Sequence, residues 1–287
     1  MKDRNKVVKM VIIITIVCVL VILGAAIGLK YTSLGEKIES KISGSNTEDT
    51  IIPGEENIPE DNPDLVSNIQ VDYKTEKYET KNDDGDVVCL NERNIPTVSN
   101  DAYPRGAKRI ENALRSIMND MWNNDLKRYS DDSKELGTAE KPLGVKYMAN
   151  LEYQTPNVVT FSIKMEGDFG AESWNSYELY TFDVKTGFTV SLESSSAKAE
   201  EMTKDIMSLT KKAIKEKGIN ISLKEGESED SVITTNMNRQ GHFGILADGV
   251  HVNYQKYDLT TENDQILEVV LEANKANSFL KDEYKIK

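Results

Sequence analysis

The hydrophobic pattern opens with one long apolar run and changes to short alternating segments further along the chain. Residues 10–29 are twenty consecutive positions without a charged side chain, rich in Val, Ile and Leu. Twenty helical residues rise about 30 Å, which matches the hydrocarbon thickness of a bilayer. The run predicts a transmembrane helix, with residues 1–9 as a short cytoplasmic tail.

The charges that precede this run predict its orientation. Residues 1–9 carry four basic side chains and one acidic side chain, so the positive-inside rule places the N-terminus in the cytoplasm. The sequence therefore predicts a single-pass protein of the cell membrane with an extracellular C-terminal part. A signal peptide cleaved near Ala26 is the alternative, although the apolar stretch of such a peptide is usually about 7–15 residues long.

Residues 30–70 are polar and rich in turn-forming residues. They contain Pro53, Pro59 and Pro63 and paired acids such as Glu55-Glu56. A charged segment of low hydrophobicity buries too little surface to offset the entropy of ordering it. The segment therefore predicts a flexible acidic tether.

Alternating apolar and polar residues predict antiparallel strands after residue 70. Apolar side chains occupy every second position in residues 145–153 and in residues 159–165, with a Thr-Pro-Asn turn between them. Further strand segments are expected in residues 71–90 around an Asp-Asp-Gly-Asp turn, and in residues 180–184, 188–192, 250–254 and 267–271.

Two segments follow a helical period instead. Apolar residues recur every three or four positions in residues 110–121 and 199–214, and Gly218 marks the end of the second segment. Antiparallel strands with separate helices predict an α+β fold, a two-layer antiparallel sheet with helices packed on it, preceded by one transmembrane helix. We expect this fold to occupy residues 71–287, as one domain or as two subdomains of about 71–192 and 193–287.

Charge changes this picture when it is divided between the two sides of the membrane. Residues 1–30 hold five of the 35 basic residues and one of the 48 acidic residues, which leaves a formal net charge of −17 on the rest of the chain. Such a surface repels nucleic acid and favours basic partners or cations. Solubility alone is the plain alternative.

The reactive side chains form no catalytic or metal-binding motif. The only two histidines, His242 and His251, flank one hairpin, and alternation with Val250 and Val252 predicts an exposed His251. Zinc-ligand spacings, nucleotide loops and cofactor fingerprints are absent from the sequence. We therefore expect no metal, no cofactor and no catalytic residue. A carboxylate pair that hydrolyses a cell-wall glycan is the alternative, because acids are abundant and their pairing is spatial.

One expected loop combines acidic and aromatic side chains. It contains glycine and lies between two strong strand segments, where recognition loops are common. A solvated hairpin loop is the plain alternative. The candidate ligand contacts in this loop are Glu166, Asp168, Phe169, Glu172 and Trp174.

Two motifs, taken in their order along the chain, resemble a family of exported domains. The first is Asp-Val-Lys-Thr-Gly at residues 183–187, and the second is an Asp-Gly hairpin at residues 248–257 that ends in Tyr254 and Tyr257. They resemble the paired domains of unknown function in the extracellular part of the anti-sigma factor RsiV and beside the catalytic domain of the peptidoglycan deacetylase PdaC. The resemblance covers roughly residues 71–285.

The resemblance implies a membrane-anchored extracytoplasmic binding or sensing module for a basic, lysozyme-like protein or a cell-wall ligand, and it adds Tyr254 and Tyr257 to the candidate contacts. An accessory subunit of a cell-wall hydrolase is a further alternative. Residues 1–9 are too short to hold a sigma factor. The family's Gly-Ala-His-Gly is replaced by Gly170-Ala171-Glu172-Ser173, so no role of that histidine carries over.

Overall fold

The computed structural model describes residues 58–136, 138, 140–168, 173–261 and 265–287. The predicted cytoplasmic tail, the transmembrane helix at residues 10–29 and most of the predicted tether lie outside the described residues. Every helix in the described ranges falls short of the length or apolar character that crossing a bilayer requires. Ile52–Lys287 forms one compact unit.

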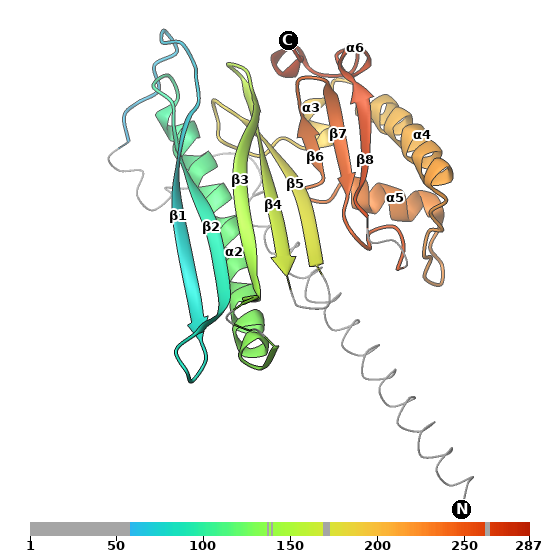
Figure 1. Ribbon diagram of the computed structural model, residues 1–287. Helices are drawn as coiled ribbons and strands as arrows, with labels where there is room; N and C mark the ends of the chain where they lie inside the picture. The colour runs from blue at the N-terminus through green and yellow to red at the C-terminus, as the bar shows by residue number, and fades with distance from the viewer. Residues whose placement is uncertain (1–57, 137, 139, 169–172, 262–264) are drawn as a thin grey trace, which may run out of the picture. The chain divides into compact units, whose positions relative to one another are not determined.

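The larger sheet has five strands in the order β1-β2-β3-β4-β5 (Figure 1). Three of the four neighbouring pairs are antiparallel, but β2 and β3 run parallel. The predicted all-antiparallel sheet is therefore wrong at this one pair, because a long helix returns the chain between β2 and β3. The strands are β1 (Gln70–Lys81), β2 (Val87–Ser99), β3 (Gly144–Gln154), β4 (Val158–Asp168) and β5 (Ser173–Asp183).

Helix α2 (Pro104–Leu136) covers one face of this sheet (Figure 1). The predicted apolar stripe faces the strands, and its Ile110, Leu114 and Met118 are fully buried. They pack in one core with Phe161 and Phe182 from β4 and β5. The predicted helix is confirmed, and burial of this stripe fixes α2 to the sheet. None of the helices that the structure describes covers the opposite face of the sheet.

Side chains join the parallel strands β2 and β3. Asn94 accepts a hydrogen bond from the Ala149 backbone nitrogen at 2.6 Å and donates one to the Ala149 carbonyl at 2.9 Å. Asn91 accepts one from the Val145 nitrogen at 2.9 Å. A Cβ on Gly144 would lie 2.0 Å from the Leu90 carbonyl oxygen, so only glycine permits this approach of the two backbones.

The second sheet has three antiparallel strands in the order β6-β7-β8. Met202, Ile206 and Ile214 of its long helix are buried against it, and that helix ends at Gly218 in the left-handed conformation, as predicted. The elements are α3 (Leu192–Ser195), α4 (Ala199–Lys217), α5 (Glu229–Met237), β6 (Phe243–Ile245), β7 (Gly249–Tyr254), β8 (Leu267–Glu272), α6 (Ala273–Ala276) and a 3-10 turn at Asp282–Tyr284.

Two segments differ from the sequence prediction. The strand expected at residues 188–192 is reduced to one bridge between Phe182 and Thr189, because Leu192 already begins α3, which Ser191 caps. Helix α5 is an element that the sequence pattern did not predict, and its first turn is capped by the Ser228 side chain.

The second sheet covers one end of the face that α2 leaves open. Thr160 of β4 donates a hydrogen bond to the Ile245 carbonyl at 2.7 Å, and the Ile245 nitrogen donates to Thr181 of β5 at 3.1 Å. Gly244 lies against the Leu179 side chain, where a Cβ would approach to 2.7 Å. The described part of the chain leaves the other end of the same face, towards Glu166 and Asn175, uncovered.

Candidate ligand groove

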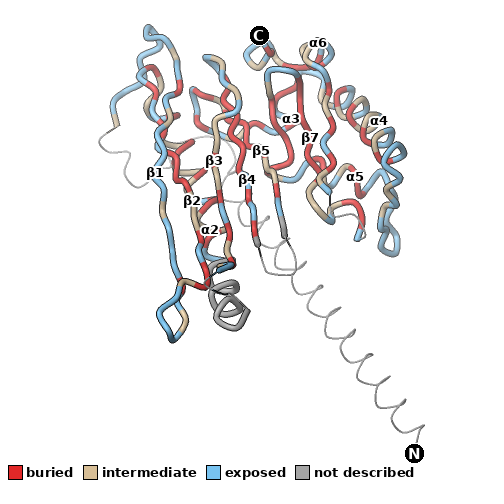
Figure 2. Tube along the Cα trace, viewed as in Figure 1, coloured by how far each residue is buried: buried red, intermediate tan, exposed pale blue. Residues whose placement is uncertain are grey.

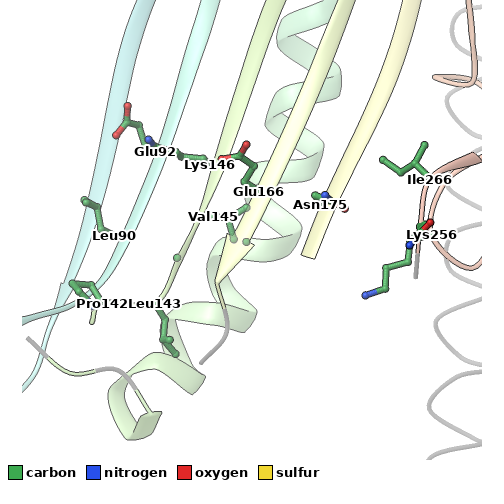
Figure 3. Close-up of a pocket in the computed structure, with 13 residues that line it drawn as sticks. Leu90, Glu92, Pro142, Leu143, Val145, Lys146, Glu166, Asn175, Lys256 and Ile266 are labelled. Carbon is green, nitrogen blue, oxygen red and sulfur yellow. The ribbon is translucent and has the colours of Figure 1, made fainter. Parts of the chain in front are cut away.

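An open groove of about 940 Å³ lies on the uncovered end of the five-stranded sheet. Strands β2 to β5 form most of its floor, and Lys256, Gln265 and Ile266, from the segment between β7 and β8, form one wall (Figure 3). The volume lies near the upper end of the range of ordinary ligand sites. The floor residues are Leu90, Glu92, Pro142, Leu143, Gly144, Val145, Lys146, Glu166, Gly167 and Asn175.

The groove carries charges of both signs. Lys146, Glu166 and Asn175 are register neighbours on β3, β4 and β5 and form one row across the floor. Glu92 is held by Lys77 at 3.2 Å, whereas Glu166 is exposed and makes no ion pair with a described residue. Glu166 is therefore the acid in the groove that is available to a cationic ligand.

Lys256 reaches the wall of the groove from a turn at residues 255–258 that several hydrogen bonds hold in place. The Gln255 side chain accepts a hydrogen bond from the Tyr177 nitrogen at 3.1 Å and donates one to the Tyr177 carbonyl at 2.6 Å. Asp258 accepts from the Gln255 nitrogen and forms an ion pair with Arg239 at 2.6 Å. Burial raises the pKa of Asp258 to about 6, although the Arg239 charge opposes that rise.

The turn holds Tyr257 in a conformation that L-residues rarely adopt. Its φ is +69°, and it is the one non-glycine residue with positive φ in the described ranges. The Lys256 ammonium lies 5.0 Å from the centre of the Tyr257 ring. A strained residue persists only where the surroundings over-determine it, and here Gln255 and Asp258 do so on either side. The turn thus presents Lys256 to the groove in a fixed place.

The predicted contacts fall in different environments. Glu166 lines the groove, and Tyr257 is 56% exposed at the turn beside it. Asp168 ends β4 and Trp174 lies in β5, while their side chains are outside the described part of the structure. Phe169 and Glu172 lie outside the described residues altogether. The structure therefore places Glu166 in the groove and Tyr257 on the turn beside it.

Tyr254 belongs to the core of the second sheet. Its side chain is 0% exposed, and its hydroxyl lies 3.1 Å from the Thr210 hydroxyl of α4. Burial raises the pKa of Tyr254 to about 12. In this conformation Tyr254 offers no surface to an external ligand and instead holds α4 to β7.

The prediction that His251 is exposed is wrong, since only 5% of the residue is accessible. Alternation fails because every residue of β7 is buried, which means that both faces of this central strand are covered (Figure 2). The ring nitrogens Nδ1 and Nε2 each lie 2.8 Å from a carboxylate, of Glu268 and Asp248 respectively. The hydrogen bond from His251 lowers the pKa of Asp248.

His242 is likewise buried, at 2% exposure, between the two sheets. Burial and the nearby Arg239 lower the pKa of His242 to about 3, so its ring is neutral at ordinary pH. Within the ranges that the structure describes, no group of three or more histidine, cysteine, aspartate or glutamate side chains is arranged to hold a metal ion.

The motif at residues 183–187 is a structural turn. Asp183 accepts hydrogen bonds from the nitrogen and hydroxyl of Thr186, at 2.7 and 2.8 Å, and one from the Tyr284 hydroxyl at 3.1 Å. Gly187 has a φ of +73° and packs on Gly106 of α2, where a Cβ would lie 2.4 Å from the Gly106 carbonyl oxygen. The motif therefore joins α2, β5 and the C-terminal segment.

Sequence reasoning missed Lys146, Asn175 and Lys256 as groove residues. The signal for Lys146 was available, because the predicted pair of strands around the Thr-Pro-Asn turn places it opposite Glu166. Lys256 gave no such signal, since contacts between two separate sheets position it.

These elements define a class of two-sheet α+β domain with a groove on one face of its larger sheet. Neither the protein-family models nor the curated proteins give a match. Among solved structures, a DUF3298 family protein from Pseudomonas aeruginosa is similar, with a TM-score of 0.51 and 12% identity over 77% of this chain and 99% of that chain. A DUF3298 family member from Bacteroides fragilis is similar too, with a TM-score of 0.53 and 10% identity over 77% and 98% of the two chains. At these identities the likeness shows the fold, which is that of a domain of unknown function.

Proposed function

We propose that the protein is an extracytoplasmic binding or sensing module, anchored in the cell membrane by residues 10–29, whose groove binds a basic protein. The observation that carries the proposal is Glu166, which lines the groove and has no ion pair with a described residue. The formal charge of −17 beyond residue 30 supports it, because the summed field attracts cationic partners before contact.

The shape of the site favours binding over chemistry. The groove is open and lies on a sheet, and its wall is fixed by the contacts of Gln255 and Asp258. A preorganised surface loses little conformational entropy on binding, so more of the contact energy appears as affinity. The resemblance to the RsiV domain makes lysozyme the first basic protein to test.

The experiment measures binding of lysozyme to the fragment of residues 52–287, the compact unit of the structure, by calorimetry at about 50 and 300 mM salt. We expect affinity to fall as salt rises, and Glu166→Lys to weaken binding by about tenfold, which corresponds to about 1.4 kcal/mol. Glu225→Lys is the matched control, because it makes the same charge change on an exposed residue outside the groove.

Two results would overturn the proposal. One is the absence of salt-sensitive binding to lysozyme. The other is an equal loss of affinity in the Glu166 and Glu225 variants, which would place the contact outside the groove. Binding of purified peptidoglycan without any binding of lysozyme would replace the basic protein by a wall polymer as the ligand.

A further inference from the structure

The outer edge of β5 is sealed by other parts of the chain along most of its length. This strand ends the five-stranded sheet, so one side of its backbone faces away from β4. Tyr177 bonds outward through both its nitrogen and its carbonyl, to the Gln255 side chain. The Leu179 nitrogen donates outward to the Gly241 carbonyl at 2.7 Å.

The same pattern continues to the end of the strand. The Thr181 carbonyl accepts from the Val190 nitrogen at 2.7 Å, and the Asp183 nitrogen donates to the Phe188 carbonyl at 2.9 Å. Outward hydrogen bonds therefore occur at every second residue. Because backbone direction alternates with a period of two, the outward groups at the other end of β5 belong to Ser173 and Asn175.

These last two positions are not sealed by the described chain. Neither the Ser173 nor the Asn175 backbone forms an outward hydrogen bond to a described residue. The groove begins at this point, with Asn175 on one side and Lys256 and Ile266 on the other (Figure 3). The stretch of edge that has no partner among the described residues and the groove are thus parts of one site.

We propose that an extended peptide segment of the partner adds to β5 at Ser173 and Asn175 as a further strand and lies in the groove with a basic side chain towards Glu166. This inference rests on the proposed function and specifies how the partner is held. The outward N–H and C=O groups of Ser173 and Asn175 are two residues apart, which is a spacing of roughly 7 Å along the strand. The backbone of an extended peptide has the same spacing and can pair with them by strand addition. Glu166 is the register neighbour of Asn175 on β4, so β5 separates it from the added strand by about 10 Å, a distance that a long basic side chain lying over Asn175 spans.

The test uses a pool of N-acetylated hexapeptide amides with lysine fixed at the third position and the other positions randomised. Peptides that bind the 52–287 fragment are enriched and sequenced, and hydrogen exchange is measured with the best of them. We expect slower exchange at the Asn175 amide in the complex. Asn175→Pro, which removes that donor at an edge where proline is tolerated, should weaken binding about tenfold.

Two controls separate backbone pairing from other effects. Asn175→Ala removes the side chain but keeps the amide, so it should bind within about twofold of the original protein. Two versions of the same peptide are N-methylated, one at the odd and one at the even residues, and both keep all side chains. Only the version whose methyl groups block the N–H groups facing β5 should lose affinity, by about tenfold. That second control needs no protein variant and stands even where Asn175→Pro fails to fold.

Strand addition is refuted by failure to enrich any peptide, by unchanged exchange at Asn175, or by equal binding of both N-methylated peptides. The proposed function has a separate readout, which is salt-sensitive binding of lysozyme. Lysozyme binding that is insensitive to Asn175→Pro would leave the proposed function in place and remove the strand-addition inference. Peptide binding without lysozyme binding would leave strand addition in place and remove lysozyme binding as the proposed function.

Discussion

Tyr257 stores backbone strain beside the groove, and this strain is measurable. A φ of +69° costs an L-residue roughly 1–2 kcal/mol, and glycine avoids that cost. Tyr257 is 56% exposed, so removal of its side chain loses little buried surface. We expect Tyr257→Gly to leave the free energy of unfolding unchanged or to raise it by about 1 kcal/mol, as measured by urea denaturation of the 52–287 fragment.

Tyr78→Gly is the comparison for this prediction. Tyr78 is 47% exposed and lies in strand β1, where tyrosine has an ordinary conformation. Its replacement by glycine should lower the free energy of unfolding by about 1 kcal/mol, because glycine weakens a strand. Equal losses in the two variants would show that Tyr257 is not strained.

At the scale of single residues, the sequence predicted the groove only in part. Glu166 could be found because its segment alternates clearly and leads into a loop with acids and aromatics. His251 was misjudged, since alternation separates inside from outside only when one face of a strand meets solvent. β7 is covered on both faces, and no local pattern within six residues reveals that.

At the scale of elements, two buried asparagines add side-chain hydrogen bonds to the short parallel ladder between β2 and β3. Asn94 is 6% exposed and satisfies both the nitrogen and the carbonyl of Ala149, which is 0% exposed. Asn94→Ala would leave both groups buried without a partner. We expect it to lower the free energy of unfolding by about 2–4 kcal/mol, since each buried unsatisfied group costs roughly 1–3 kcal/mol.

Asn150→Ala on β3 is the matched control, because the Asn150 side chain is only partly buried and its one hydrogen bond to a described residue, to the Met148 carbonyl, is 3.5 Å long. This variant should change the free energy of unfolding by less than about 1 kcal/mol. If Asn94→Ala and Asn150→Ala lower the free energy of unfolding equally in thermal and urea experiments, the hydrogen bonds of Asn94 do not stabilise the pairing of β2 with β3.

The elements themselves follow from the sequence where one physical signal dominates. The α2 stripe and the alternation in β3 and β4 are long and regular, so helix and strand were correctly predicted there. α5 was missed because polar residues make up its first turn, and its helical start depends on the Ser228 cap. The parallel pairing of β2 with β3 is a tertiary property, set by where α2 returns the chain, and alternation does not encode it.

At the scale of the whole molecule, the junction of the two sheets contains buried ionisable groups. Glu178 of β5 accepts a hydrogen bond from Tyr180, and Gly241 packs so closely on both that a Cβ there would lie 2.9 Å from the carboxylate. Burial raises the pKa of Glu178 to about 7, although the hydrogen bond from Tyr180 and the charge of Arg239 oppose the rise. The pKa of Asp258 is raised to about 6 and that of His242 is lowered to about 3 in the same region.

The shifts of Glu178 and His242 make the stability of the junction depend on pH in opposite directions. A carboxyl whose pKa is raised by folding stabilises the protein fully below its ordinary pKa, near 4.5 for Glu178, and that stabilisation is lost as pH rises through about 7. A histidine whose pKa is lowered by folding stabilises the protein above its ordinary pKa of 6.5, and that stabilisation is lost as pH falls towards 3. The total stability therefore depends on both, and a single variant is needed to isolate Glu178.

Glu178→Gln removes one of these titrations without changing the size of the side chain. At pH 5 the native carboxyl is mostly protonated, so the variant and the original protein should unfold at similar temperatures. At pH 8 the native carboxylate is charged and removed from water, and the variant should be the more stable by at most about 3.5 kcal/mol, given roughly 1.4 kcal/mol for each pKa unit between 4.5 and about 7. Thermal unfolding of the 52–287 fragment between pH 5 and 8 measures the difference, with Glu225→Gln as an exposed control that should follow the original protein throughout. Parallel curves for the Glu178 variant and the original protein would mean that the junction between the sheets admits enough water to keep this carboxylate ordinary, and the coupling of β5 to the second sheet would then not depend on pH.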